Sequence, residues 1–166
     1  MENFDFLFRR THSDYRKNRN IWEKSRAAYI GGSDYIQNSL IRHVSEIDLE
    51  FAERVRRAYY FNYPRRIAQL ITQYIFATEP QRINADMELL EDFSRTGART
   101  GDVMRQFSTL LNIYGKAILI VEMPFFEGEM DFERRRRERI RPFARALSPL
   151  EAVDYAYGSD GKLEWL

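Results

Sequence analysis

The 166-residue sequence contains no cysteine and only two histidines, His12 and His43. Without cysteine the chain has no disulfide, no thiolate metal ligand and no cysteine nucleophile. The two histidines lie far apart in the sequence, so neither a histidine-based zinc site nor a catalytic histidine dyad is expected. The chemistry that remains available rests on carboxylates, hydroxyls and arginines.

Long apolar runs are also missing. The longest uninterrupted run, Ala117 to Val121, is far below the roughly 20 residues that cross a bilayer. The first residues lack the basic start and apolar stretch of a signal peptide. A net charge of +1 gives the whole chain no bias toward nucleic acid or a membrane surface. These features predict a soluble protein, cytoplasmic at synthesis, with no membrane partner.

What the sequence does contain is a balance of 44% hydrophobic and 31% charged residues, which is typical of a folded domain. Apolar spacing predicts helices over residues 14–29, 47–59, 64–78 and 100–114, and a shorter one opened by Asn84. Ser45 is the expected N-cap of the second helix, and Gly115 the expected stop of the last. Residues 33–36 are expected to be extended.

After Gly115 the pattern changes from helix to strand. Residues 117–121 form a β-branched run that predicts a strand covered on both faces. Further strands are expected at 143–147, 153–157 and 162–166, and Ser148-Pro149-Leu150-Glu151 predicts a single helical turn with a capping box. The predicted fold is α+β in one domain: N-terminal amphipathic helices over residues 1–115, then a mostly antiparallel sheet, incomplete here, over residues 116–166.

No catalytic arrangement emerges from the spacing of polar residues. Carboxylates gather in the Asn84 segment, where no histidine or phosphate-binding loop accompanies them: Asp86, Glu88, Glu91 and Asp92. A solvated helix face is the favoured interpretation. A magnesium-dependent nuclease using Asp86 and Glu91 is kept as a minor hypothesis, because its ligand set is incomplete. We therefore expect no enzyme, no cofactor and no metal site.

Arginines form the strongest local charge. Residues 131–145 hold seven arginines against three acidic residues, a local charge of +4: Arg134, Arg135, Arg136, Arg137, Arg139, Arg141 and Arg145. Guanidinium groups suit phosphate, so DNA contact is one hypothesis; pairing with acidic groups of a neighbouring subunit is the favoured one. Arg54, Arg56 and Arg57 on the outer face of the second helix are further candidates for a subunit interface or a DNA contact.

A cluster of aromatic residues lies at the junction of the second and third predicted helices: Tyr59, Tyr60, Phe61 and Tyr63. Such rings could stack on bases. Because they lie between two amphipathic segments, packing between helices is the favoured interpretation.

Several landmarks along the chain share their order and spacing with a known family. The first landmarks are Gly31-Gly32 after the first helix and, on the next two helices and their connection, Glu53, Arg54, Ala58, Tyr59, Tyr60, Phe61, Asn62, Arg66 and Phe76. The later ones are the helix-to-strand step from Ile113 to Val121, Arg141-Pro142-Phe143, and the segment from Ser148 to Tyr155. In this order and spacing the chain resembles the N-terminal part of portal proteins of tailed bacteriophages and prophages. The likeness spans most of the chain, although the position of Tyr155 often holds tryptophan in similar sequences.

The resemblance implies a structural role. Portal proteins form a ring, typically of twelve subunits, at one capsid vertex, where they conduct double-stranded DNA during packaging and ejection. The implied partners are other copies of the chain, the terminase large subunit, head-completion and adaptor proteins, and the major capsid and scaffolding proteins. The implied location is the virion, reached from the host cytoplasm. This segment would supply part of the outer wing, since the channel-lining stem and the clip have no counterpart in it.

A second hypothesis from a different class is a free-standing nucleic-acid-binding module built on the run from Arg134 to Arg141. Tight, salt-sensitive binding of duplex DNA by the chain alone would favour it over the structural subunit.

Overall fold

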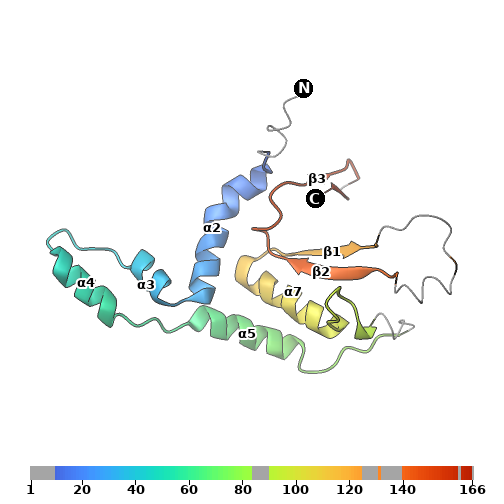
Figure 1. The fold of residues 1–166 in the computed structure, drawn as a ribbon, viewed down its shortest axis with the longest axis horizontal. Coiled ribbons are helices and arrows are strands. Elements are labelled where there is room, and N and C mark those ends of the chain that lie inside the picture. Colours follow the sequence, from blue (N-terminus) through green and yellow to red (C-terminus); the bar gives the residue numbers. More distant parts are fainter. Residues whose placement is uncertain (1–9, 84–89, 125–130, 132–139, 161, 166) are drawn as a thin grey trace.

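The computed structural model describes residues 10–83, 90–124, 131, 140–160 and 162–165. This part of the chain is α+β, as predicted, with five helices followed by short antiparallel strands (Figure 1). The helices are α2 (Ser13–Ile30), α3 (Ser33–Ser39), α4 (Asp48–Arg57), α5 (Tyr63–Ile75) and α7 (Thr100–Tyr114). The strands are β1 (Ile118–Glu122), β2 (Phe143–Leu147), β3 (Ala156–Tyr157) and β4 (Leu163–Trp165).

Helix α7 is the centre of the packed body. It contacts α2 and α5 on one side and strand β2 on the other (Figure 1). The buried apolar side chains come from these elements and from the segments on either side of β2, and four of the nine are alanines: Trp22, Ala68, Val103, Ile140, Phe143, Ala144, Ala146, Ala152 and Tyr155. The core that holds the helices to the sheet is therefore compact.

The two strand pairs are separate. Strands β1 and β2 pair antiparallel from Ile118↔Leu147 to Glu122↔Phe143, and β3 pairs with β4. Strand β2 is mostly buried, since its inner face lies on α7. Strand β1 is not covered on both faces as predicted: Val121 is 61% exposed. A β-branched run indicates a strand, but it does not reveal whether a second layer covers it.

The predicted end of α7 and the predicted capping box after β2 are both confirmed. Gly115 takes a left-handed conformation (φ 71°) and its N–H donates to the Leu111 carbonyl, which stops α7. At the predicted capping box, the backbone N–H and the hydroxyl of Ser148 each donate to Glu151 Oε2 at 2.7 Å. That single turn ends β2 and redirects the chain toward α2.

Two local predictions were wrong. Residues 33–36 are not extended but belong to α3, because Gly32 (φ 90°) reorients the chain and Asp34 supplies a negative charge in the first turn. Ser45 does not cap α4. The helix begins two residues after Glu46, with Ile47 at the cap position and its N–H donating to the Glu50 carboxylate at 3.4 Å. The helix predicted from Asn84 lies largely outside the described residues.

A polar cluster fastens the first turn of α2 to the sheet. Lys116 Nζ, just before β1, donates to Asp14 Oδ2 at 2.8 Å and to the Tyr155 hydroxyl at 2.6 Å. The Tyr155 hydroxyl donates to the same Asp14 oxygen at 2.9 Å, and the His12 ring stacks on the Tyr155 ring at 4.0 Å. The hydrogen bonds from Lys116 and Tyr155 lower the pKa of Asp14 below its ordinary value.

This cluster predicts acid-sensitive stability. Because the pKa of Asp14 is lowered in the folded state, its carboxylate stabilises the fold above the unfolded-state pKa, and that contribution is lost as the pH falls through the folded-state pKa. Asp14→Asn should therefore lower the free energy of unfolding by about 1 kcal/mol at pH 7. At pH 3 the difference from wild type should be smaller, as urea denaturation at the two pH values will measure. An equal deficit at both values would contradict the role given to the charge.

Candidate interaction surface

The joint between α2 and α5 depends on one side chain. The Asn62 amide group donates to the carbonyl of Tyr29 at 2.9 Å and to that of Ile30 at 3.3 Å, at the end of α2. Its side-chain oxygen accepts from the Arg65 N–H at 2.9 Å and so caps α5. Asparagine carries both a donor and an acceptor, so one residue satisfies backbone groups at the end of one helix and the start of the next.

Tyr60 strengthens the same joint. Its hydroxyl donates to the Ala28 carbonyl at 2.9 Å, and its ring lies 4.5 Å from the Tyr35 ring of α3. Gly31 (φ 68°) leaves room for this approach, since a Cβ there would lie 2.8 Å from Asn62 Nδ2 and 3.1 Å from Tyr60 Cδ1. Glycine is required at position 31 for both its backbone conformation and its lack of a side chain.

The connection from α4 to α5 has two chemically different sides. In an extended segment, successive side chains point in opposite directions. Tyr60 and Asn62 face α2, while Tyr59 and Phe61 face solvent with Tyr63, the first residue of α5. The ring centroids of Tyr59 and Phe61 lie 4.6 Å apart, and those of Phe61 and Tyr63 6.1 Å apart. These three rings are 76%, 65% and 66% exposed, so the prediction that the aromatic cluster packs between helices holds only for Tyr60.

The aromatic row continues into the apolar stripe of α5. Ala68 and Thr72 are the buried residues of this helix, which packs that narrow side on α7. There Asn112 Nδ2 donates to Thr72 Oγ1 at 3.2 Å. The stripe of larger apolar residues on α5 adjoins this buried side and is 42% to 75% exposed: Ile67, Leu70, Ile71, Tyr74 and Ile75. Helix α5 thus buries its less apolar side.

Together the aromatic row and the exposed stripe make one surface, which we call the outer stripe: Tyr59, Phe61, Tyr63, Ile67, Leu70, Ile71, Tyr74 and Ile75. Taking roughly 200 Å² for each of these eight side chains and the exposures above, its area is on the order of 900 Å². The largest apolar patch on a typical monomer is about 300–600 Å². A surface of this size indicates a partner.

A second apolar surface lies on the arm, which we define as residues 40–58. Helix α4 and the loop before it stand apart from α7 and the sheet (Figure 1), and α4 packs substantially on no other helix or strand that the structure describes. Apolar side chains of the loop and of the first turn of α4 are 58% to 100% exposed and form what we call the arm tip: Ile41, Val44, Ile47 and Leu49.

Ion pairs hold the loop of the arm on α4. Arg54 donates to both carboxylate oxygens of Glu46, at 2.9 and 2.8 Å, and to the Ile41 carbonyl at 2.8 Å. Arg42 donates to the Glu46 carbonyl and pairs with Asp48. The hydrogen bonds from Arg54 lower the pKa of Glu46 to about 2, so this pair stays charged across the physiological range.

The predicted arginine sites divide into three groups. Arg54 and Arg57 lie on α4, but Arg54 is engaged by Glu46 within the arm, and the exposed Arg57 pairs with Glu53 at 3.3 Å. Arg141 pairs with Asp92 beside the sheet and is 19% exposed at its side chain. The remaining candidates lie outside the described residues: Arg134, Arg135, Arg136, Arg137 and Arg139. The described members therefore stabilise local structure.

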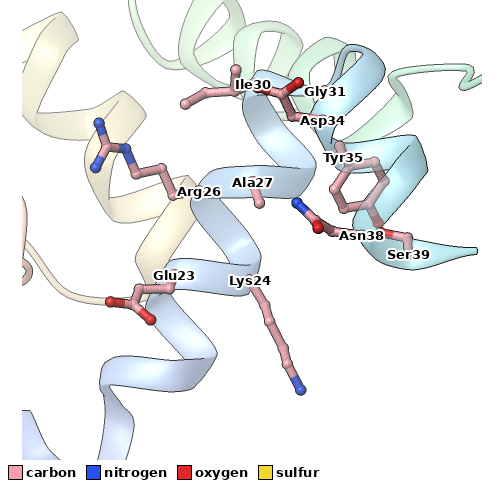
Figure 2. Close-up of a pocket in the computed structure, with 10 residues that line it drawn as sticks. All are labelled: Glu23, Lys24, Arg26, Ala27, Ile30, Gly31, Asp34, Tyr35, Asn38 and Ser39. Carbon is pink, nitrogen blue, oxygen red and sulfur yellow. The ribbon is translucent and has the colours of Figure 1, made fainter.

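A groove of about 740 Å³ runs between α2 and α3. Figure 2 shows Tyr35 and Asn38 of α3 facing Ala27, whereas Lys24 extends away from these residues. Glu23 is held by Arg19 at 2.7 Å rather than directed at a ligand. The lining side chains do not converge on one point as the polar groups of a ligand site do.

The carboxylates considered as metal ligands do not form a site in the described residues. Asp86 and Glu88 lie outside them, and Asp92 pairs with Arg141. Across the described ranges no group of three His, Asp or Glu side chains is placed to hold a metal ion. In the same ranges no helix is long and apolar enough to cross a membrane.

Sequence reasoning missed the outer stripe as a surface, although it identified the residues in it. The available signal was the adjoining side of α5, where Ala68 and Thr72 offer a small contact suited to a close helix neighbour. Comparison of the chain with protein-family models and with curated proteins finds no match.

The double cap predicts a large effect of a single substitution. Asn62→Ala removes the α5 N-cap and the donors to two carbonyls, and should lower the free energy of unfolding by roughly 2 kcal/mol in urea denaturation. Asn38→Ala, an exposed asparagine on α3, is the matched control and should change it by less than about 0.5 kcal/mol. Equal effects of the two substitutions would show that Asn62 does not hold the joint.

Proposed function

We propose that this chain is the wing-forming N-terminal part of a phage or prophage portal protein, a structural subunit of the ring at the capsid vertex. The observation that carries the proposal is the pair of large uncovered apolar surfaces on a small packed body. A subunit that closes a ring must keep such surfaces for its neighbours. The order of Gly31-Gly32, the aromatic-asparagine cluster and the step at Gly115 resembles that family.

The residues that carry the resemblance to portal proteins hold structural positions in this fold. Gly31, Tyr60 and Asn62 make the joint between α2 and α5. Gly115 ends α7 before β1, and Ser148 and Glu151 form the turn after β2. Residues that set the geometry of helix joints and turns are consistent with a scaffold role and involve no catalytic group.

The charge of the chain suits a conduit. Each phosphate that a protein neutralises adds salt-dependent affinity, so a strongly basic channel wall would retain DNA. A net charge of +1 and paired arginines on α4 are consistent with a wing segment that does not retain DNA near the channel. The partners proposed with this role are further copies of the chain in a ring of typically twelve, the terminase large subunit, head-completion and adaptor proteins, major capsid and scaffolding proteins, and the DNA that passes through. The proposed location is the virion.

The test combines electron microscopy with a capture experiment. The protein that contains this chain should form rings with a central channel in negative stain, and the rings should retain the terminase large subunit encoded with it. Channel-free particles, or rings that do not bind this terminase, would overturn the proposal.

Titration with duplex DNA separates the proposal from the nucleic-acid-binding module. The portal role predicts that the chain alone binds no more tightly than about 10⁻⁴ M at physiological salt. Micromolar or tighter binding that weakens steeply with added salt, and that is lost on Arg135→Glu and Arg136→Glu, would support the module instead. In the portal role the same charge reversals should weaken ring assembly, and an unchanged oligomer mass at several salt concentrations would contradict that part.

A further inference from the structure

We infer that the arm tip of one copy packs on the outer stripe of the next copy, so that the chain assembles head to tail. This inference rests on the proposed ring and names the two surfaces that join neighbouring subunits within it. The juxtaposition that carries it is an arm that packs substantially on no other described helix or strand and an exposed apolar helix face, both in one molecule.

The two surfaces belong to different parts of the molecule. The arm tip comes from the loop before α4 and the first turn of α4, and most of the outer stripe lies on α5, beside the packed body (Figure 1). Two distinct patches on one chain generate a heterologous contact, in which each copy uses one patch on either side. Such a contact repeats from copy to copy and closes as a ring when its rotation allows.

The area available matches a stable contact. The outer stripe, on the order of 900 Å², is close to the roughly 800 Å² that each partner contributes to a standard interface. Its aromatic rings are the kind of residue that dominates binding energy in such interfaces. Covering Tyr59, Tyr63 and Tyr74 would remove the most exposed aromatic area of this surface from water.

The arm is prepared for docking before it meets a partner. Arg54 and Arg42 fix the loop through Glu46, so Ile41 and Val44 are presented on a loop that is already ordered. A preorganised loop loses less conformational entropy on binding than a free one. Val44 is fully exposed at 100%, so packing within the described part of the chain does not account for an apolar residue there.

Charge does not oppose the contact. The arm holds four arginines and four carboxylates, so it is neutral when His43 is neutral. Helix α5 carries Arg65 and Arg66 only at its start, next to the aromatic row. Neutral and weakly basic surfaces can approach without repulsion, so apolar burial decides the affinity. A second copy is the occupant that these observations favour, because it supplies both surfaces in equal number.

The experiment uses complementation between two variants of the full chain. Val44→Asp places a charge on the arm tip and Tyr74→Asp places one on the outer stripe; both side chains are highly exposed, so the fold of each monomer should persist, as circular dichroism will check. Light scattering should show that the self-association affinity of each variant alone is at least roughly tenfold weaker than that of the wild type. Mixed in equal amounts, the two should form dimers, since one intact tip and one intact stripe remain between them.

Cysteine cross-linking provides the second measurement. Because the chain has no natural cysteine, any disulfide must involve the introduced residues. A chain with Val44→Cys should form a disulfide with a chain carrying Tyr74→Cys, and not with one carrying the matched control Ile21→Cys, which is 60% exposed on α2. Cross-linking of Tyr74→Cys with itself, without the Val44 pairing, would show a symmetric contact between α5 helices and overturn the inference.

The outcomes separate this inference from the proposed function. If the rings capture terminase and their assembly is unchanged by Val44→Asp and Tyr74→Asp, the arm contact is contradicted and the portal role is supported. If the two variants form dimers when mixed but the protein binds no terminase, the arm contact is supported and the portal role is contradicted. If each variant alone associates as the wild type does, the arm tip and the outer stripe do not join copies.

Discussion

The arrangement of the helical part depends on the contact of Asn62 and Tyr60 with the last carbonyls of α2. These hydrogen bonds set the start of α5, and α5 in turn lies on α7, which carries the sheet. The arm leaves from the other end of the same short segment. Thus the direction of the arm, the placement of the exposed rings and the contact of α5 with the body all follow from the hydrogen bonds of Tyr60 and Asn62 to the backbone carbonyls just before Gly31.

Helix α5 shows why an amphipathic pattern does not identify the interior. Its strongest stripe, which includes Ile67 and Tyr74, is exposed, and the helix meets α7 through Ala68 and Thr72. Small residues let two helix backbones approach closely, and the Thr72–Asn112 hydrogen bond satisfies the polar group that becomes buried. The large side chains are then available to another molecule. In a protein built for assembly, the apolar side of a helix and its buried side can differ.

Much of the local structure could be predicted from the sequence because it follows from near neighbours. Gly115, the Ser148–Glu151 turn and strand β2 lie where backbone preferences and spacing place them. The α3 helix could not be predicted, since Gly31-Gly32 indicates a stop without showing that a helix follows directly. The rings of the outer stripe that precede α5 were assigned to packing between helices, because spacing shows which residues share a side and not which side meets the body. The role of Arg54 depends on Glu46, eight residues away across a turn.

The connection from Ala58 to Asn62, whose residues alternate between half-buried and exposed, limits how its length can change. Because alternate residues face opposite ways, adding or deleting one residue would turn Tyr60 and Asn62 outward and bring the exposed rings against the end of α2. A change of two residues would keep every side chain on its present side. In natural variants of this chain, the connection should therefore vary in steps of two or not at all, whatever happens to the loop that precedes α4.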